Sequence, residues 1–426
     1  MVRFGVWKVC ALAGALALAL AAVTAPGTAA VGWKKPVNLG PRVSDLHLTD
    51  FSVGARGDAA IVWYSKQPKP PFAYRVRVAV RGNGHGWGRP VNLYAGNHGA
   101  ALDGPHVVVN SGGMVTTLWA QGVDGSDTSH CSVRAAHGKM DAAWSLPKAL
   151  SKECAKDTSL TVDGQGNLVG VWQSLDTGLA MYATKTGGQQ WSAAAPVPHT
   201  SGLAVRGLAT DEAGDSALVL AGDRQGKRGV YVARRQGASG WSKPVKISGV
   251  EPLGPAQVAE STKGDVTVMW SAARKHILTA SSPAHGSWSK ARRLGKGARS
   301  HLTYAGRRAL AVWASPRGST MFAMKPRRGG WRAVANLSGT SKRNKDQGLS
   351  SDGQGHVTVV WCNFFTGDIL SSTRGKKGKW SAVQTVARKG YLTSPFIAST
   401  PAGQTWITWR DKHRHQKFRA QASRQR

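Results

Sequence analysis

A tryptophan preceded by a turn rich in Gly and Lys recurs eight times along the chain, at a period near fifty residues. These leading tryptophans are Trp33, Trp87, Trp144, Trp191, Trp241, Trp288, Trp331 and Trp380. In seven repeats a second tryptophan follows 25–32 residues later, at Trp63, Trp119, Trp172, Trp270, Trp313, Trp361 and Trp409. In the fourth repeat the equivalent place holds Leu220. Self-similarity at this spacing is typical of an array of supersecondary units.

The third repeat indicates what one unit contains. Residues 159–163, 167–172, 179–184 and 191–197 are short segments rich in Val, Trp, Tyr and Ala, and Gly-rich turns separate them. Four such segments in a row predict a four-stranded β-meander.

The first turn of the unit also keeps its register. A glycine lies six residues before the second tryptophan at Gly57, Gly113, Gly166, Gly264, Gly355 and Gly403, and we expect a positive φ there. Asp begins this turn at Asp163, Asp211 and Asp352, and Asn110 replaces it in the second repeat. One carboxylate per loop is too few oxygens for calcium, so we interpret these residues as turn formers. The sixth repeat is compressed, with Gly306 one residue out of place, so its turn should differ.

Four-stranded units repeated radially predict an all-β fold, a β-propeller with eight blades. The chain begins with an isolated fourth strand at residues 33–39 and finishes with three strands near residues 394–399, 404–410 and 417–423. Pairing these segments would complete the eighth blade and cover two exposed sheet edges. Seven blades is the alternative, if the compressed sixth repeat forms no full blade. We expect residues 31–426 to form this single domain.

Residues 1–30 have the layout of a secretory signal peptide, with a basic start, an apolar run too short to span a membrane and small residues for cleavage. We therefore expect a secreted, extracellular protein with no transmembrane segment.

Cys131 and Cys154 lie 23 residues apart within one repeat and are candidates for a disulfide in oxidising surroundings. For the odd Cys362, a buried inert thiol is favoured over a reactive one.

The fixed register of the paired tryptophans favours a structural role, with one indole per blade packing against the neighbouring sheet. Trp406 is out of register and is the one tryptophan of the mature chain to consider for a ligand surface. Even for Trp406 the core interpretation is favoured.

The chain resembles secreted bacterial β-propeller proteins of the sialidase-like (BNR or Asp-box) kind. The resemblance rests on the Gly-Trp-Ser-x-Pro strands, of which residues 240–244 are the clearest, and on the Asp-Gly-x-Gly…Trp hairpins. The sialidase Asp-box places Trp three residues after Gly, whereas the gap here is six. Sialidases also use three arginines, a Tyr paired with Glu, and an Asp. With only Glu153, Glu212, Glu251 and Glu260 as glutamates, we can assemble no such set. The resemblance implies the fold and argues weakly against the activity.

Other catalytic arrangements find no support in the sequence. The usual ligand face of a propeller carries Asp45, Asp50, Asp103, Asp124, Asp157, Asp176, Asp223, Asp346 and Asp368, and nothing singles out a pair. Nucleophile elbows, phosphate loops and zinc-ligand spacings are absent. We therefore expect no catalytic residue, no metal and no cofactor, and we predict that the protein is not an enzyme.

The chain is strongly basic, with 57 Lys and Arg against 22 Asp and Glu. Basic residues recur in the hairpin between the third and fourth strands of most units, with more on the fourth strand, such as Lys290, Arg292 and Arg293. The candidates for binding a polyanion are Arg234, Arg235, Lys325, Arg327, Arg328, Arg374, Lys376, Lys377 and Lys379. The alternative interpretation is a rim that only keeps the protein soluble.

These observations favour a monomeric, non-catalytic binding protein. Its basic rim would face an anionic polymer, such as a cell-wall phosphate polymer, an acidic polysaccharide or extracellular nucleic acid. Sequence-specific recognition of nucleic acid finds no support, because the sequence predicts no recognition helix. A glycan-active hydrolase or lyase and a protein-interaction scaffold remain as alternatives.

Overall fold

The computed structural model describes residues 32–425, apart from 42, 44, 67–73, 97–101, 122–130, 333, 342, 353, 389–392 and 414–416. Residues 32–426 belong to one compact unit. The proposed signal peptide, residues 1–30, and Asp124 lie outside the described residues. Within the described part of the chain, no helix is long and apolar enough to cross a membrane.

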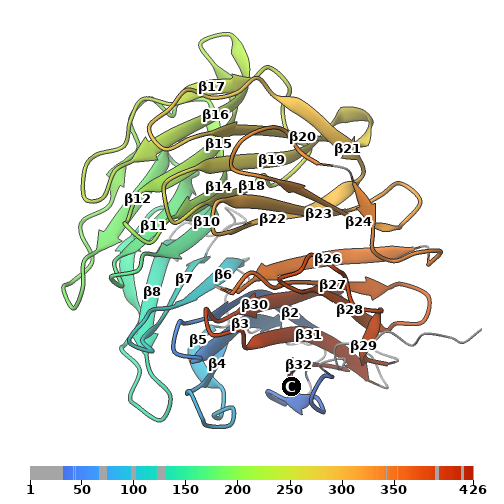
Figure 1. The fold of residues 1–426 in the computed structure, drawn as a ribbon. Coiled ribbons are helices and arrows are strands. Elements are labelled where there is room, and N and C mark those ends of the chain that lie inside the picture. The colour runs from blue at the N-terminus through green and yellow to red at the C-terminus, as the bar shows by residue number, and fades with distance from the viewer. Residues whose placement is uncertain are drawn as a thin grey trace, which may run out of the picture. The chain divides into compact units, whose positions relative to one another are not determined.

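The described residues form eight antiparallel four-stranded sheets, one per repeat (Figure 1). Blade one is β2 (Asp45–Val53), β3 (Ala59–Lys66), β4 (Tyr74–Arg81) and β5 (Val91–Gly96), and blade two is β6 (Leu102–Val109), β7 (Val115–Gln121), β8 (Ser132–Gly138) and β9 (Lys148–Ser151). Blade three is β10 (Ala155–Val162), β11 (Leu168–Ser174), β12 (Ala180–Lys185) and β13 (Ala195–Pro196), and blade four is β14 (Leu203–Thr210), β15 (Ser216–Arg224), β16 (Lys227–Arg235) and β17 (Val245–Ser248).

Blade five is β18 (Gln257–Glu260), β19 (Val266–Ala272), β20 (His276–Ser282) and β21 (Arg292–Lys296), with a short 3₁₀ turn, Ala273–Lys275, between β19 and β20. Blade six is β22 (Ala298–Ala305), β23 (Arg308–Ala314), β24 (Thr320–Lys325) and β25 (Ala335–Asn336), and blade seven is β26 (Asn344–Ser351), β27 (Val357–Asn363), β28 (Ile369–Arg374) and β29 (Gln384–Ala387). Blade eight is β30 (Thr393–Ser399), β31 (Thr405–His413), β32 (Lys417–Arg424) and the N-terminal β1 (Val37–Asn38).

The first strand of each blade contacts the first strand of the next blade, and β30 contacts β2, so the blades form a closed ring. The N-terminal segment completes the last blade: β1 pairs with β32, and Leu39 donates from its backbone N–H to the carbonyl of Ala420 at 3.0 Å. The eight-bladed propeller is therefore confirmed, and the seven-bladed alternative is wrong. The compressed sixth repeat forms a complete sheet, because only its first turn is shortened, to Gly306 and Arg307 between the paired residues Ala305 and Arg308.

The paired tryptophans form the frame of the molecule. All seven second tryptophans have at most 1% of their surface exposed, and Leu220 is fully buried in the same place. Leading tryptophans pack on the preceding blade, as Trp87 does edge-on against Trp406 with ring centroids 6.2 Å apart. Trp406 is only 6% exposed, so its core interpretation is confirmed and a ligand surface there is excluded.

The turn residues have the roles that the sequence predicts. The carboxylate of Asp163 accepts hydrogen bonds from the backbone N–H groups of Gln165 and Asn167, at 2.9 and 2.8 Å. Gly166 closes this turn with φ +86°.

Cys131 and Cys154 form a disulfide with their Cα atoms 4.6 Å apart. Cys362 is a buried free thiol, and burial raises its pKa to about 12, so it is inert at neutral pH.

Candidate functional site

The hairpins between third and fourth strands share one face of the ring with the turns between first and second strands. This follows from the antiparallel order of every sheet, in which successive links alternate between the two faces. All nine basic candidates lie in these hairpins or at the strand ends beside them. The structure separates them into side chains that line a pocket, side chains held between blades and side chains exposed elsewhere on the rim.

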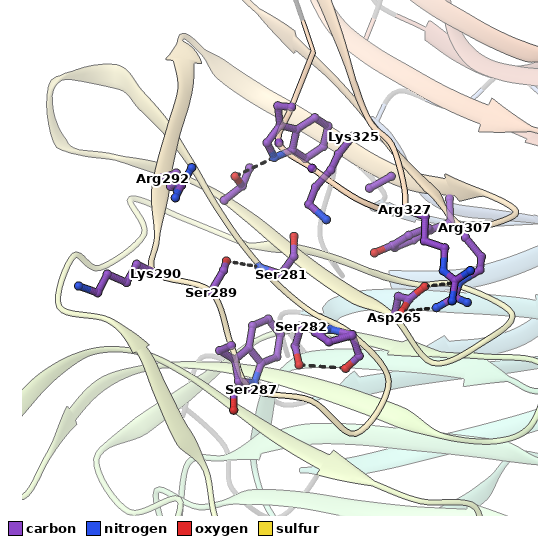
Figure 2. A pocket seen from close by; sticks show the side chains of 18 of the residues that line it. Asp265, Ser281, Ser282, Ser287, Ser289, Lys290, Arg292, Arg307, Lys325 and Arg327 are labelled. Atoms are coloured by element: carbon purple, nitrogen blue, oxygen red, sulfur yellow. Dashed lines mark hydrogen bonds and ion pairs between the residues drawn. The ribbon is translucent and has the colours of Figure 1, made fainter.

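A pocket of about 900 Å³ opens on this face between blades five and six. Figure 2 shows Lys290 and Arg292 at the left of the pocket and Lys325, Arg327 and Arg307 at the right. Blade five supplies its left wall from β20 and the hairpin leading to β21, and blade six supplies the other wall from β22, β24 and the turn after β24. The indoles of Trp288 and Trp331 also line it.

At two other interfaces a large aromatic side chain lies at the equivalent place. Tyr182 of β12 packs edge-on against Trp241 with ring centroids 6.1 Å apart, and Phe322 of β24 packs against Trp380 at 4.9 Å. Both rings belong to residues that pair with the position just before the second tryptophan of their blade. In each case the third strand of one blade closes its interface with the next.

Blade five has a small polar residue at this register position. Thr279 pairs with Met269, just before Trp270, as Tyr182 and Phe322 do in their blades. Its hydroxyl accepts a hydrogen bond from the indole N–H of Trp331 at 3.0 Å. A threonine has less volume than an aromatic ring, but Ala135, Ser371 and Ala422 are smaller still at the same register position, so Thr279 alone does not account for the pocket beside Trp331.

The pocket is strongly positive. Its lining includes Lys290, Arg292, Arg293, Arg307, Lys325 and Arg327. Asp265 is the one carboxylate among the lining residues, and Arg307 donates two hydrogen bonds to it at 2.8 and 2.9 Å. Burial alone would raise the pKa of Asp265, but the bonds from Arg307 and a backbone N–H hold it below its usual range. The remaining five cations have no carboxylate within ion-pairing distance among the described residues.

Arg234 and Arg235 lie instead between blades, at the end of β16. Both are partly buried, and burial lowers their pKa values below the usual range. The guanidinium of Arg234 lies 5.3 Å from the ring centroid of Trp288. Its positive charge acts to lower the pKa of Glu260, against the larger effect of burial. These two arginines are interface residues, whereas the sequence places them on an open rim.

The other candidates are spread over the rim. Arg328 is exposed on the hairpin after β24 but is not among the residues that line the pocket. Arg374, Lys376, Lys377 and Lys379 belong to the end of β28 and the following hairpin of blade seven. Lys376 donates to the side-chain oxygen of Gln354 at 3.3 Å, and neither it nor its neighbours line the pocket.

Sequence reasoning found Lys325 and Arg327 of the pocket and, as fourth-strand cations, Lys290, Arg292 and Arg293. It missed Arg307 and Thr279. A comparison of the third strands in register does not single out Thr279, because two blades have Tyr182 and Phe322 there and the others have Val, Ala or Ser.

Carboxylates on the innermost strands are engaged across neighbouring blades. Asp50 contacts His106 at 3.3 Å, and Asp157 contacts Arg206 at 3.4 Å. These four residues, from β2, β6, β10 and β14, line a second pocket of about 520 Å³. Asp346 forms an ion pair with Arg299 in the same manner between blades six and seven. Each of these aspartates therefore serves at least one contact that joins two blades.

No known family model matches the chain, and no curated protein matches it in sequence. Solved structures share the fold at low identity. The BP39L lectin from Burkholderia pseudomallei superposes with a TM-score of 0.55 at 15% identity, covering 82% of this chain and all of the lectin chain. A variant of NanB sialidase from Streptococcus pneumoniae gives 0.46 at 11% identity over 92% of this chain and 70% of its own. The polysaccharide lyase Uly1 gives 0.47 at 7% identity over 92% and 91%. The superposition on the BP39L lectin confirms, at the level of the fold, the β-propeller that the resemblance implies.

Proposed function

We propose that the protein is an exported, non-catalytic binding protein, and that it holds a segment of an acidic polysaccharide in the pocket between blades five and six. The observation that carries this proposal is the charge of the pocket. It presents Lys290, Arg292, Arg293, Lys325 and Arg327 to solvent, while its single carboxylate, Asp265, is neutralised by Arg307. A cavity with this balance attracts anions and repels cations.

The other lining groups suit a sugar chain. Trp288 and Trp331 offer flat apolar surfaces, and Ser281, Ser287 and Ser289 supply hydroxyls around them. A sugar ring has an apolar face that stacks on an aromatic ring and hydroxyls that exchange hydrogen bonds with polar side chains. Carboxylate or sulfate groups on the same chain would pair with the lysines and arginines. The BP39L lectin shares the fold, which is consistent with a carbohydrate ligand.

The arrangement of acids favours binding over hydrolysis. Glycosidases generally use two carboxyl groups that flank the bond to be cleaved. The pocket has Asp265 alone, and both of its oxygens are occupied by Arg307. Release of new reducing ends from any of a panel of acidic polysaccharides would contradict the proposal.

The test is the affinity of the purified protein for heparin, taken as a soluble acidic polysaccharide, measured by calorimetry between about 50 and 300 mM salt. Affinity should fall steeply as salt rises, because counterions are released from the polymer on binding. Lys325→Gln with Arg327→Gln should weaken binding about tenfold and flatten the salt dependence. The control Lys376→Gln with Lys377→Gln removes equal charge from blade seven and should change affinity little. Equal losses in both double variants would indicate a diffuse basic rim instead of a site.

Filling the cavity tests its role independently of charge. Thr279→Phe places a ring where Phe322 and Tyr182 lie in other blades, so binding should drop at least tenfold while the fold is retained. Thr385→Phe, on the exposed face of β29, is the matched control. Unchanged heparin affinity in a folded Thr279→Phe variant would place the ligand outside this pocket.

A further inference from the structure

The face opposite the pocket carries exposed apolar side chains at its projecting links. Phe364 and Phe365, at the hairpin between β27 and β28, are 58% and 66% exposed. Val250 and Leu253 are exposed in the link from β17 to β18. Links between second and third strands and links between blades all lie on this face, because the strands of each sheet alternate in direction.

The two phenylalanines are held in place rather than left on a loose loop. The side-chain oxygen of Asn363 accepts hydrogen bonds from the backbone N–H groups of Phe365 and Thr366, at 3.0 and 3.2 Å. The backbone N–H of Phe364 donates to the carbonyl of Arg343 at 3.1 Å. Neither phenyl ring lines the pocket between blades five and six or the pocket at the innermost strands. The hairpin therefore presents two fixed rings to solvent.

Each ring lies against a cation. The guanidinium of Arg343 is 3.9 Å from the ring centroid of Phe365, and the ammonium of Lys345 is 3.6 Å from that of Phe364. Arg343, Lys345, Phe364 and Phe365 together form the aromatic tip of this face. The neighbouring hairpin of blade six adds the exposed Arg317 and is tied to this region through the bond from the Asn344 N–H to the Gly318 carbonyl, at 2.7 Å. Further exposed cations on links of the same face are Lys227, Arg228, Arg274 and Lys275.

We propose that this face docks on an anionic lipid surface, with the aromatic tip entering the headgroup region. The transfer of exposed phenyl rings from water to the acyl boundary is favourable. The adjacent lysine and arginines attract anionic headgroups. Their long side chains can keep the charge at headgroup level while the rings lie deeper. A soluble polyanion would use the cations but would leave the two rings in water. The charge and the apolar surface together therefore favour a lipid surface over a second polymer site.

The experiment is flotation of the purified protein with vesicles of phosphatidylcholine containing about 30% phosphatidylglycerol, compared with pure phosphatidylcholine vesicles. The wild type should partition at least tenfold more onto the anionic vesicles. Phe364→Ser with Phe365→Ser should lower this partition about tenfold or more, and Lys345→Gln with Arg317→Gln should lower it at low salt. Leu146→Ser with Val383→Ser removes apolar surface that is 89% and 46% exposed on the fourth-strand segments and should bind like the wild type.

Three vesicle-binding outcomes and one heparin-binding outcome would overturn the proposal. The vesicle-binding outcomes are equal binding to the two kinds of vesicle, unchanged binding of the double serine variant, and loss of vesicle binding in the pocket variant Lys325→Gln with Arg327→Gln. The last result would show that lipid phosphates enter the polysaccharide pocket instead. Heparin affinity of the double serine variant should equal that of the wild type, and its loss would make the tip a second polyanion site. Thermal melting of each variant checks that the fold is retained.

Discussion

Glu260 and Arg234 are an acidic and a basic side chain that face each other in the interface between blades four and five. One oxygen of Glu260 and two nitrogens of Arg234 are buried without a hydrogen-bond partner among the described residues. Burial, reinforced by the negative charge of Asp211, raises the pKa of Glu260 to about 9, although Arg234 opposes the shift. At neutral pH Glu260 is therefore mostly protonated, and Arg234 has no full counter-charge from it.

The pKa of Glu260 predicts a pH dependence of stability. The folded protein binds this proton more tightly than the unfolded chain, whose reference pKa is 4.5. The stability that the group contributes is therefore complete below that pH and is lost as pH rises through about 9. Glu260→Gln keeps a neutral side chain at every pH, so its free energy of unfolding should exceed that of the wild type by roughly 1–3 kcal/mol near pH 9 and equal it near pH 4.

Urea denaturation across this pH range measures the effect. Glu251→Gln is the matched control, because the carboxylate of Glu251 instead pairs with Arg228 at 3.6 Å in the link after β17. A wild type and a Glu260→Gln variant with parallel stability profiles would show that Glu260 is ionised in the folded protein.

At the scale of the element, the turn between first and second strands sets the register of each sheet. Asp163 accepts two backbone hydrogen bonds and a third from the side chain of Asn167, at 2.8 Å. Asn110 holds the same turn in blade two through bonds from Gly112 and Met114, at 3.0 and 2.9 Å. One oxygen, charged or neutral, is thus sufficient to hold the turn.

Asp163→Ala should lower the free energy of unfolding by about 1–2 kcal/mol, because it leaves these N–H groups without their acceptor. Asp163→Asn should lower it by less than half as much, since an amide oxygen serves in blade two. Chemical denaturation of the two variants compares them directly. Equal losses would mean that the charge of Asp163, rather than its acceptor geometry, supports the turn.

At the scale of the whole molecule, the N-terminal segment completes the last blade of the ring. Val37 pairs with Ala422, the indole N–H of Trp33 donates to Ser371 at 2.9 Å, and Leu39 is buried with 2% of its surface exposed. In Figure 1 the blue N-terminal segment lies beside the red C-terminal strands. The contacts of residues 33–39 thus join both ends of the chain and also reach blade seven.

Deletion of residues 32–39 should lower the melting temperature by on the order of 5 °C or more and should leave the edge of β32 open to another chain. Differential scanning fluorimetry and light scattering after size-exclusion chromatography measure the two effects. Lys34→Gln with Lys35→Gln keeps the strand and serves as the control. A deleted chain that melts like the wild type and stays monomeric would show that blade eight closes without β1.

Most of the fold could be predicted from the sequence, because its signals are local and recur in every repeat. The second tryptophans, the positive-φ glycines such as Gly166 and the terminal strands that form blade eight, one N-terminal and three C-terminal, lie where their register predicts. The basic rim was also visible as a pattern. The sequence did not show which basic residues line a pocket and which lie between blades. Arg234 and Lys325 both lie at the end of a third strand, yet Arg234 is held between blades and Lys325 lines the pocket.

The sequence by itself predicted the propeller and its closure and favoured eight blades over seven, since hydrogen bonding and burial within one unit follow from a period of about fifty residues. Only the tertiary structure decided where the ring is hollow. The pocket lies where blades five and six face each other, and its lining brings together Thr279 and Trp331, two residues 52 positions apart on different blades. A cavity forms where the side chains that face each other across an interface leave space between them, so neither repeat alone carries a signature of it.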